Sequence, residues 1–377
     1  MTRILHVATV MGSGGLEKWL VDLVAEMEGS SYESHILVQS GQVGLHGERA
    51  KNLGLSVLTV PDGHHPLQFS VQFMKLLRKR GPFDVVHSHV HNFSGLVLTL
   101  ARFAGVPVRI AHAHNDTSRE GGGSIRKAYR WLSRRLISSS ATHGYGVSRD
   151  AAVDLFGGEF GRDPRWEVLP CGISLEPFRI AYDRAELRRD VGLPLEAFVM
   201  VQVGRLASFK NQEFSIRLLA ELDIPDAVLL LVGDGELEHR CRRLAGDLNV
   251  SERVIFAGAR PDISRVLSAS DLFLFPSTPG EGAPIALIEA QAAGLRCLVS
   301  EHIPETSMVV RELVRRISIE GTMDPWKQAI GQVYNSRAST DKEAALESIE
   351  RSPFSIEANH TELSRIYKPR VGMPAVS

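Results

Sequence analysis

The chain has 377 residues, of which 44% are hydrophobic and 23% are charged, so its composition is that of a globular protein rather than of a disordered, collagenous or coiled-coil chain. At roughly 150 residues per domain, this length favours two domains. The 43 basic residues balance the 44 acidic ones. The part through residue 181 is slightly basic and the rest slightly acidic, and a nucleic-acid-binding protein would concentrate much more positive charge.

Short apolar runs alternate along the whole chain with segments of helical periodicity. Apolar strands separated by helices predict parallel sheets covered on both faces, because parallel strands need crossover connections. The expected strands are 4–10, 35–39, 57–60, 84–89, 108–113, 142–147, 198–203, 228–232, 254–257, 272–276 and 297–300. The clearest helical segments are 16–27, 69–77, 214–222 and 284–293, with a last amphipathic helix over 354–367.

A linker is expected at 169–178, which contains two prolines and a glycine, and the strand series restarts near residue 197. We therefore predict two doubly wound, Rossmann-like α/β domains facing a central cleft, with an eight-stranded barrel as the alternative fold. The first domain is expected to span 1–181 and to be joined by a C-terminal helical segment, 353–377. The second is expected to span 182–352.

Three cysteines, Cys171, Cys241 and Cys297, form no CxxC pair, which favours a reducing compartment over a disulfide framework or a zinc–thiolate site. The first apolar run is short and interrupted by His6, unlike a signal peptide. The longest candidate for a membrane span, 93–108, contains Arg102, Gly105 and Pro107. We expect a cytoplasmic protein.

A glycine-rich turn with Gly12, Gly14 and Gly15 separates the first expected strand from the first helix. Such a turn presents free backbone N–H groups to an anion. A nicotinamide dinucleotide fits poorly, because Glu17 stands where a third glycine is needed and the second strand ends at Gln39 without the usual acidic residue. An oxidoreductase is therefore a weaker hypothesis, and a tight turn with no ligand is a further alternative.

Two cations, Arg205 and Lys210, follow the first strand of the second half, at the edge where open α/β sheets bind ligands. An arginine fork and a lysine point charge together suit a diphosphate, although loop cations are often merely solvated. Further on, Glu281 precedes a helix that starts near Pro284, and Glu289 lies inside its apolar stretch. A carboxylate there needs a partner, so Glu281 is expected to bind a hexose and Glu289 a ribose, with a purely structural Glu289 as the alternative.

Four motifs occur together in a fixed order: Gly14-Gly15-x-Glu17, Gly204-Arg205 followed by Lys210, Val232-Gly-Asp-Gly-Glu236, and Glu281 followed by Glu289. The combination resembles the retaining GT-B nucleotide-sugar glycosyltransferases, specifically glycosyltransferase family 4. The resemblance runs from residue 3 to about residue 310. Segments 84–89 and 108–115 look like those of the exopolysaccharide-biosynthesis branch.

The resemblance implies a role for each matching residue. Arg205 and Lys210 correspond to the pair that neutralises the donor diphosphate, Glu289 to the ribose ligand, and His114 to a histidine beside the anomeric centre. Glu281, with the backbone amides of Gly282, Ala283 and Pro284, corresponds to the donor-sugar ligand. The remaining donor-site positions that the resemblance implies are Gly14, Gly15, Gly233, Phe256 and Gly258.

Glycosyl transfer places negative charge on a departing phosphate, which Arg205 and Lys210 are suited to stabilise. The sequence contains no Asp-x-Asp motif. We therefore expect a retaining hexosyltransferase that needs no cofactor and no metal and moves a hexose from a UDP- or GDP-sugar to a lipid-linked or growing surface polysaccharide. The alternatives are a sugar-nucleotide epimerase of the same fold and a non-catalytic assembly partner.

His87, His89 and His91 alternate along one run, and His112 and His114 along the next strand. Period two places each set on one face of a strand, so a metal site is a minor alternative to a polar lining of the cleft.

A basic segment without acidic residues follows Gly121. Basic and aromatic residues on one helix are typical of a helix lying on an anionic membrane, here its inner face, although a solvated basic helix is an equal alternative. The basic residues concerned are Arg126, Lys127, Arg130, Arg134 and Arg135.

Overall fold

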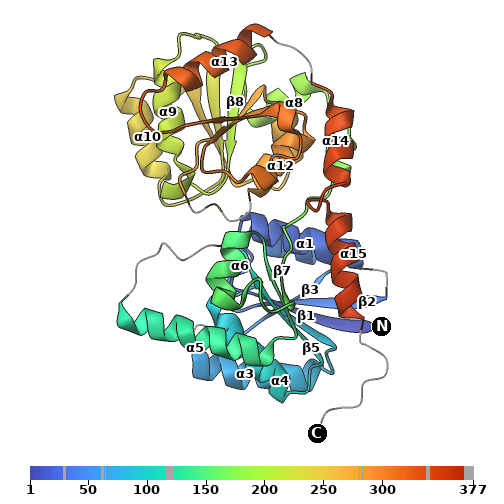
Figure 1. Ribbon diagram of the computed structural model, residues 1–377. Coiled ribbons are helices and arrows are strands. Elements are labelled where there is room, and N and C mark those ends of the chain that lie inside the picture. The colour runs from blue at the N-terminus through green and yellow to red at the C-terminus, as the bar shows by residue number, and fades with distance from the viewer. Residues whose placement is uncertain are drawn as a thin grey trace. The chain divides into compact units, whose positions relative to one another are not determined.

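The computed structural model divides the chain into two compact units, each built around one sheet (Figure 1). It describes residues 1–28, 31–60, 63, 65–115, 123–279, 281, 284–336 and 340–368. The first unit comprises Met1–Gly12, Leu16–Gly172 and the chain from Ile356 onward, and the second comprises Ser13–Gly15 and Ile173–Ser355.

The unit boundaries therefore lie after Gly172 and Ser355, whereas the sequence analysis places them after residues 181 and 352. Local contacts explain why the second unit begins at Ile173, earlier in the chain than the expected residue 182. Ile173 donates its N–H to the carbonyl of Phe354 at 2.8 Å and pairs with Ser355, and the short helix α7 (Glu176–Arg179) packs on α11 (Ile263–Ser268) of the second unit.

In the first unit, the described strands form a parallel sheet in the order β3-β2-β1-β4-β5-β6-β7. The strands are β1 (Thr2–Ala8), β2 (Tyr32–Val38), β3 (Ser56–Thr59), β4 (Val85–Ser88), β5 (Val108–Ala113), β6 (His143–Gly146) and β7 (Trp166–Val168). Residues of the central strands are buried on both faces, as expected when helices cover a parallel sheet from both sides.

The helices of the first unit lie on both faces of this sheet (Figure 1). Helices α1 and α15 cover one face, and α3, α4 and α5 lie on the other. The helices are α1 (Gly15–Met27), α2 (Leu45–Asn52), α3 (Pro66–Arg80), α4 (Ser94–Phe103), α5 (Ser124–Ser140), α6 (Arg149–Phe156) and α15 (Ile356–Tyr367). The C-terminal helix thus completes the first unit, and it begins at Ile356 rather than at residue 353.

The second unit contains its own parallel sheet, in the order β10-β9-β8-β11-β12-β13 within the described residues. The strands are β8 (Phe198–Val203), β9 (Ala227–Val232), β10 (Val254–Gly258), β11 (Leu272–Phe275), β12 (Arg296–Ser300) and β13 (Val314–Ile317). The remaining helices are α8 (Arg184–Val191), α9 (Gln212–Glu221), α10 (Glu238–Asp247), α12 (Ile285–Ala292), α13 (Asp324–Ser336) and α14 (Lys342–Glu350). Because each sheet is open and belongs to one unit, the doubly wound fold is confirmed and the barrel alternative is wrong.

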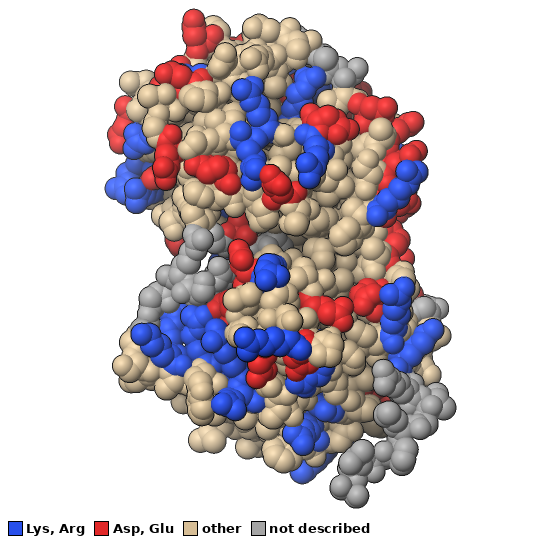
Figure 2. Space-filling view, viewed as in Figure 1, with Lys and Arg blue, Asp and Glu red and all other residues tan. Residues whose placement is uncertain are grey.

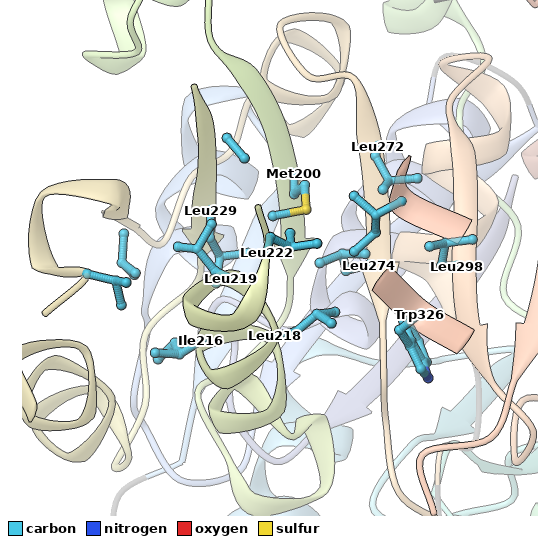
Figure 3. Packing of buried hydrophobic residues seen from close by; sticks show 14 of the residues in the cluster. Met200, Ile216, Leu218, Leu219, Leu222, Leu229, Leu272, Leu274, Leu298 and Trp326 are labelled. Atoms are coloured by element: carbon cyan, nitrogen blue, oxygen red, sulfur yellow. The ribbon is translucent and has the colours of Figure 1, made fainter. Parts of the chain in front are cut away.

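Apolar side chains from the strands and helices of the second unit form one core (Figure 3). Met200 and Leu229 project from β8 and β9 toward Leu219 of α9, and Leu298 of β12 lies near Trp326 of α13. Burying each such side chain contributes roughly 1.5–3 kcal/mol. This core holds the sheet rigid while the loops after its strands carry the polar residues.

Candidate functional site

The strand order of the second unit reverses between β8 and β11, because β9 and β10 lie on one side of β8, and β12 and β13 lie beyond β11. In open α/β sheets, ligands bind outside the carboxyl ends of the strands at such a switch point. Lys210 follows β8 and Glu281 follows β11, so the two residues come from the two loops that flank this point.

Lys210 and Glu281 meet in an ion pair, in which Lys210 Nζ donates to Glu281 Oε2 at 2.7 Å. Their side chains are only 11% and 9% exposed. The ammonium also lies 4.5 Å from the ring centroid of Phe275, the last residue of β11, within the range of a cation–π contact. Phe275 is a contact that the sequence analysis did not single out, although its position at the end of an apolar strand was the available signal.

Glycines allow the loops after β8 and β9 to approach closely. Gly204 has φ +147°, and a Cβ there would lie 3.0 Å from Lys210 Cε. Gly233 has φ +137°, and a Cβ there would lie 2.2 Å from the Gly204 carbonyl oxygen. Gly233 also donates its N–H to the Gly258 carbonyl at 2.8 Å, which ties the loops after β9 and β10 together. The observed contacts of Gly233 are therefore with the backbone of the neighbouring loops.

Arg205 and Glu289 differ in exposure. Arg205 is exposed in the turn after β8, and its backbone carbonyl accepts a bond from Gln212 Nε2 at 2.9 Å. Glu289 lies in the middle of α12 and is only 3% exposed. A buried carboxylate needs hydrogen-bond donors to offset its desolvation, so Glu289 is a fixed acceptor rather than a mobile surface acid.

The other expected donor-site positions of the second unit also lie at or after the carboxyl ends of its strands. Phe256 is half-buried on β10, and the guanidinium of Arg242 stacks over its ring at 4.1 Å. Gly258 has φ +66° and open space where a Cβ would be. Pro284 caps α12, which begins at Ile285. Gly282 and Ala283 lie outside the described residues.

A hollow of about 600 Å³ in the second unit lies elsewhere, at the amino ends of the strands near Phe198 and Arg296. Its main charges satisfy one another, because Arg184 and Arg188 both bind Asp271, at 2.5 and 2.8 Å. The position of the candidate site therefore follows from the switch point and the Lys210–Glu281 pair rather than from this hollow.

Gly15 begins α1, and Gly14 is half-buried in the turn that precedes it. The contacts of Ser13–Gly15 group this turn with the second unit. His114 directly follows β5 and is 7% exposed. Its Nε2 lies 2.9 Å from His89 Nδ1, and its Nδ1 lies 3.5 Å from Cys171 Sγ.

His114 belongs to a cluster of imidazoles on the face of the sheet that α1 and α15 cover, packed against Trp19 and Tyr367. Burial, with a smaller contribution from neighbouring histidines, holds the pKa of His114 well below its ordinary value. The same burial lowers the pKa of His6 and His112 to about 3. The cluster is therefore neutral at pH 7. Its members are His6, His87, His89, His112 and His114.

The sequence analysis placed the two histidine sets on strand faces but missed His6, whose register partner is His87 on the neighbouring strand. The signal was its position two residues from Ile4 and Ala8, on one face of β1. The rings of His6, His87 and His89 offer nitrogens within 4.8 Å of one another, and so do those of His89, His112 and His114. Both sets need His89, whose two ring nitrogens already bond to His6 and His114, so a cation would have to break an existing contact.

The basic helix α5 carries both half-buried and exposed cations. Arg130 binds the fully buried carboxylate of Asp154, and Arg134 donates to the Asp154 carbonyl at 2.7 Å. These two arginines therefore anchor α5 to α6. Arg126, Lys127 and Arg135 are exposed, and Arg135 stacks on Trp131.

Exposed apolar side chains accompany these cations, and Figure 2 shows basic side chains gathered over the α5 side of the first unit. In the described part of the chain, no helix is long and apolar enough to cross a membrane. The exposed apolar residues of α5 are Ile125 (88%), Tyr129 (46%), Trp131 (60%) and Leu132 (50%).

Comparisons with known proteins match both units. Residues 14–172 match the family described as "Glycosyl transferase 4-like domain", and residues 183–350 match "Glycosyl transferases group 1". The chain is 31% identical to EpsF of Bacillus subtilis (strain 168), whose name describes a glycosyltransferase, over 335 residues, which cover 88% of this chain and 87% of that protein. It is 34% identical over 253 residues, 64% of each chain, to the Escherichia coli "UDP-Gal:alpha-D-GlcNAc-diphosphoundecaprenol alpha-1,3-galactosyltransferase".

A solved structure of Anabaena HepE with UDP and glucose is similar in fold, with a TM-score of 0.79 and 18% identity over 97% of this chain and 99% of that one. At this identity the likeness shows the fold alone.

Proposed function

Because this chain belongs to the GT4-type, GT-B glycosyltransferase family, we propose that it transfers a hexose from a nucleotide sugar to a lipid-linked saccharide, with retention of the anomeric configuration. The observation that carries the donor site is the buried Lys210–Glu281 pair at the switch point. Two residues implied to bind the donor come from separate loops and meet within hydrogen-bond distance.

Each residue has a distinct role in this proposal. Lys210 and Arg205 bind the donor diphosphate and stabilise the negative charge that develops on it, the kind of interaction that contributes most to catalysis of such steps. Glu281 accepts hydroxyl groups of the donor sugar, and Glu289 accepts those of the ribose. Glu281 neutralises Lys210 in the structure, and in this proposal donor binding exchanges the pair for contacts of each residue with the donor.

The reaction proceeds on one face of the sugar. The acceptor hydroxyl oxygen bonds to the anomeric carbon as the bond from that carbon to the diphosphate breaks, and the hydroxyl proton passes to the departing phosphate. In this proposal His114 acts on the sugar at its anomeric carbon. The sequence has no Asp-x-Asp motif, so we propose that cations of the protein rather than a metal ion neutralise the leaving group.

The names of the relatives guide the choice of substrates. One relative is named for a UDP-Gal donor and a diphosphoundecaprenol-linked acceptor, and the structurally similar HepE was solved with UDP and glucose. We therefore propose a UDP-hexose as donor, with a GDP-hexose as the alternative, and a polyprenyl-diphosphate-linked sugar as acceptor.

We propose in addition that α5 docks on an anionic membrane, where such an acceptor resides. The support is the combination of exposed cations with exposed apolar side chains on one helix, which suits the headgroup boundary of a bilayer. Cosedimentation with phosphatidylglycerol vesicles should fall after Trp131 and Leu132 are replaced by Ser, and also after Arg126, Lys127 and Arg135 are replaced by Gln. Unchanged cosedimentation of both variants would refute docking through α5.

Thermal unfolding with UDP, GDP, ADP and their hexose derivatives tests the donor site. A ligand that binds only the folded protein stabilises it by about 2.7 kcal/mol at a hundredfold excess over Kd. We expect UDP-hexoses to raise Tm in the wild type and much less in Lys210→Gln. Transfer to a polyprenyl-diphosphate sugar, with the anomer of the product determined by NMR, tests the reaction. A folded protein that responds to no nucleotide would contradict the proposed donor site.

A further inference from the structure

A continuous chain of ring contacts runs through the buried histidine cluster of the first unit. His6 Nδ1 lies 3.2 Å from His89 Nε2, and His89 Nδ1 lies 2.9 Å from His114 Nε2. At its other nitrogen, His114 approaches Cys171 Sγ at 3.5 Å. All four residues are buried. The exposed fractions of His6, His89, His114 and Cys171 are 0%, 5%, 7% and 2%, respectively.

These contacts restrict where the protons lie. A neutral imidazole carries one N–H, so in every nitrogen–nitrogen contact one ring donates and the other accepts. Only two arrangements satisfy both contacts. Either His6, His89 and His114 all carry the proton on Nδ1, or all three carry it on Nε2.

His6, the first ring in this series of contacts, distinguishes the two arrangements of protons. Among the described residues, His6 Nε2 is buried without a hydrogen-bond partner. The Nε2–H arrangement would leave a buried N–H donor unsatisfied there, which is rarer in proteins than an unsatisfied acceptor. The Nδ1–H arrangement leaves only a lone pair at that atom, so it is favoured.

We propose that His89 is a positioning residue that holds His114 with its proton on Nδ1, and that His6 fixes the tautomer of His89 in turn. The importance of His114 for transfer rests on the proposed function, but its tautomer does not. His89 Nδ1–H donates to His114 Nε2, which fixes the ring and leaves Nδ1–H as its donor. The Cys171 sulfur is a weak acceptor, so His114 can exchange this contact for a contact with a substrate oxygen.

Nitrogen NMR of the uniformly 15N-histidine-labelled full chain measures the tautomers directly, with each signal assigned by its loss in a His→Asn variant. We expect His6, His89 and His114 all to show Nδ1–H in the wild type at pH 7.5. An Nε2–H signature for any of the three would overturn the proposal. This measurement needs no activity, so a wild type that transfers no sugar would refute the proposed function and leave the tautomer result standing.

The variant test uses a matched control on the same strand. His87 is as buried as His89, but it bonds Tyr367 at 2.6 Å instead of joining the chain. We expect His89→Leu to convert the His114 signal to a mixture of tautomers and to lower kcat about tenfold, the effect of one hydrogen bond, with little change in the donor KM. His87→Leu should change neither the His114 tautomer nor kcat. His89→Asn, whose amide can replace the Nδ1–H donor, should restore both the single tautomer of His114 and the wild-type kcat. Equal effects of the two Leu variants would refute a specific role for His89, and if His89→Leu does not fold, the wild-type tautomers decide alone.

Discussion

Acidification should unfold the first unit before the second. Burial lowers the pKa of His6 and His112 to about 3, from an ordinary value of 6.5 that applies in the unfolded chain. Because the folded pKa lies below the unfolded one, the unfolded state binds more protons between these values, and stability is lost as the pH falls below 6.5. At pH 5, the two groups together cost about 4 kcal/mol relative to pH 7.5. Burial shifts the pKa of His87, His89 and His114 in the same direction, which adds to the loss.

A loss of about 4 kcal/mol is a large part of the 5–15 kcal/mol that usually stabilises a domain. Hydrogen exchange followed by mass spectrometry at pH 7.5 and pH 5, corrected for the intrinsic exchange rate, measures the protection of backbone amides in both units of one sample. Peptides of β1, β4 and β5 should lose protection at pH 5 while those of β8 and β9 retain it. Replacing the exposed His239 by Gln should leave the difference intact. Parallel loss in both units, or full retention in the first, would show that the histidines are not buried as neutral groups.

Three substitutions test individual residues of the second unit. Lys210→Gln leaves the 9%-exposed Glu281 carboxylate without its cation. If Lys210 stabilises the leaving group, this variant should lower kcat by roughly 100-fold or more. A steady-state rate near that of the wild type would refute this role. Glu289→Gln removes a charged acceptor and should weaken nucleotide binding about tenfold in calorimetric titration, whereas an unchanged Kd would exclude the ribose role. Gly233→Ala places a Cβ 2.2 Å from the Gly204 carbonyl oxygen at φ +137°, so it should destabilise the protein by about 2 kcal/mol or more in urea unfolding. The control Gly331→Ala, whose Cβ would meet no atom within 4 Å, should not destabilise it. Equal stability of the two variants would contradict the close approach of the loops.

The sequence predicted strands well where burial on both faces demands an unbroken apolar run. The expected strands 108–113 and 198–203 match β5 and β8 residue for residue. It missed β7 and β13, because each is a short edge strand with exposed residues, and Val314–Ile317 contains two arginines where an alternating pattern would need apolar side chains. The two-unit fold and the transferase activity were predicted correctly, since motifs in fixed order carry both.

The local pairing of side chains could not be predicted in the same way. Arg130 and Arg134 look like membrane cations in the sequence, and only the packing of α5 on α6 places Asp154 between them. His6 joins the cluster because β1 pairs with β4, a register that strand periodicity alone does not fix. The pairing of Lys210 with Glu281 likewise depends on β8 and β11 being neighbours, which the order of strands along the chain does not reveal.

The last helix of the chain has a consequence for synthesis on the ribosome. Asn359 Oδ1 accepts bonds from Trp19 Nε1 and the Gly172 N–H, both at 2.7 Å, and Tyr367 contacts His87. The first unit therefore lacks the helix that covers one face of its sheet until α15 has been synthesised. Domains usually fold as they emerge, N-terminal first, but here the N-terminal unit must wait for the second unit to be translated. Nascent chains that end before Ile356 would expose the apolar and histidine-lined face of its sheet, and they are the species that chaperones should retain longest.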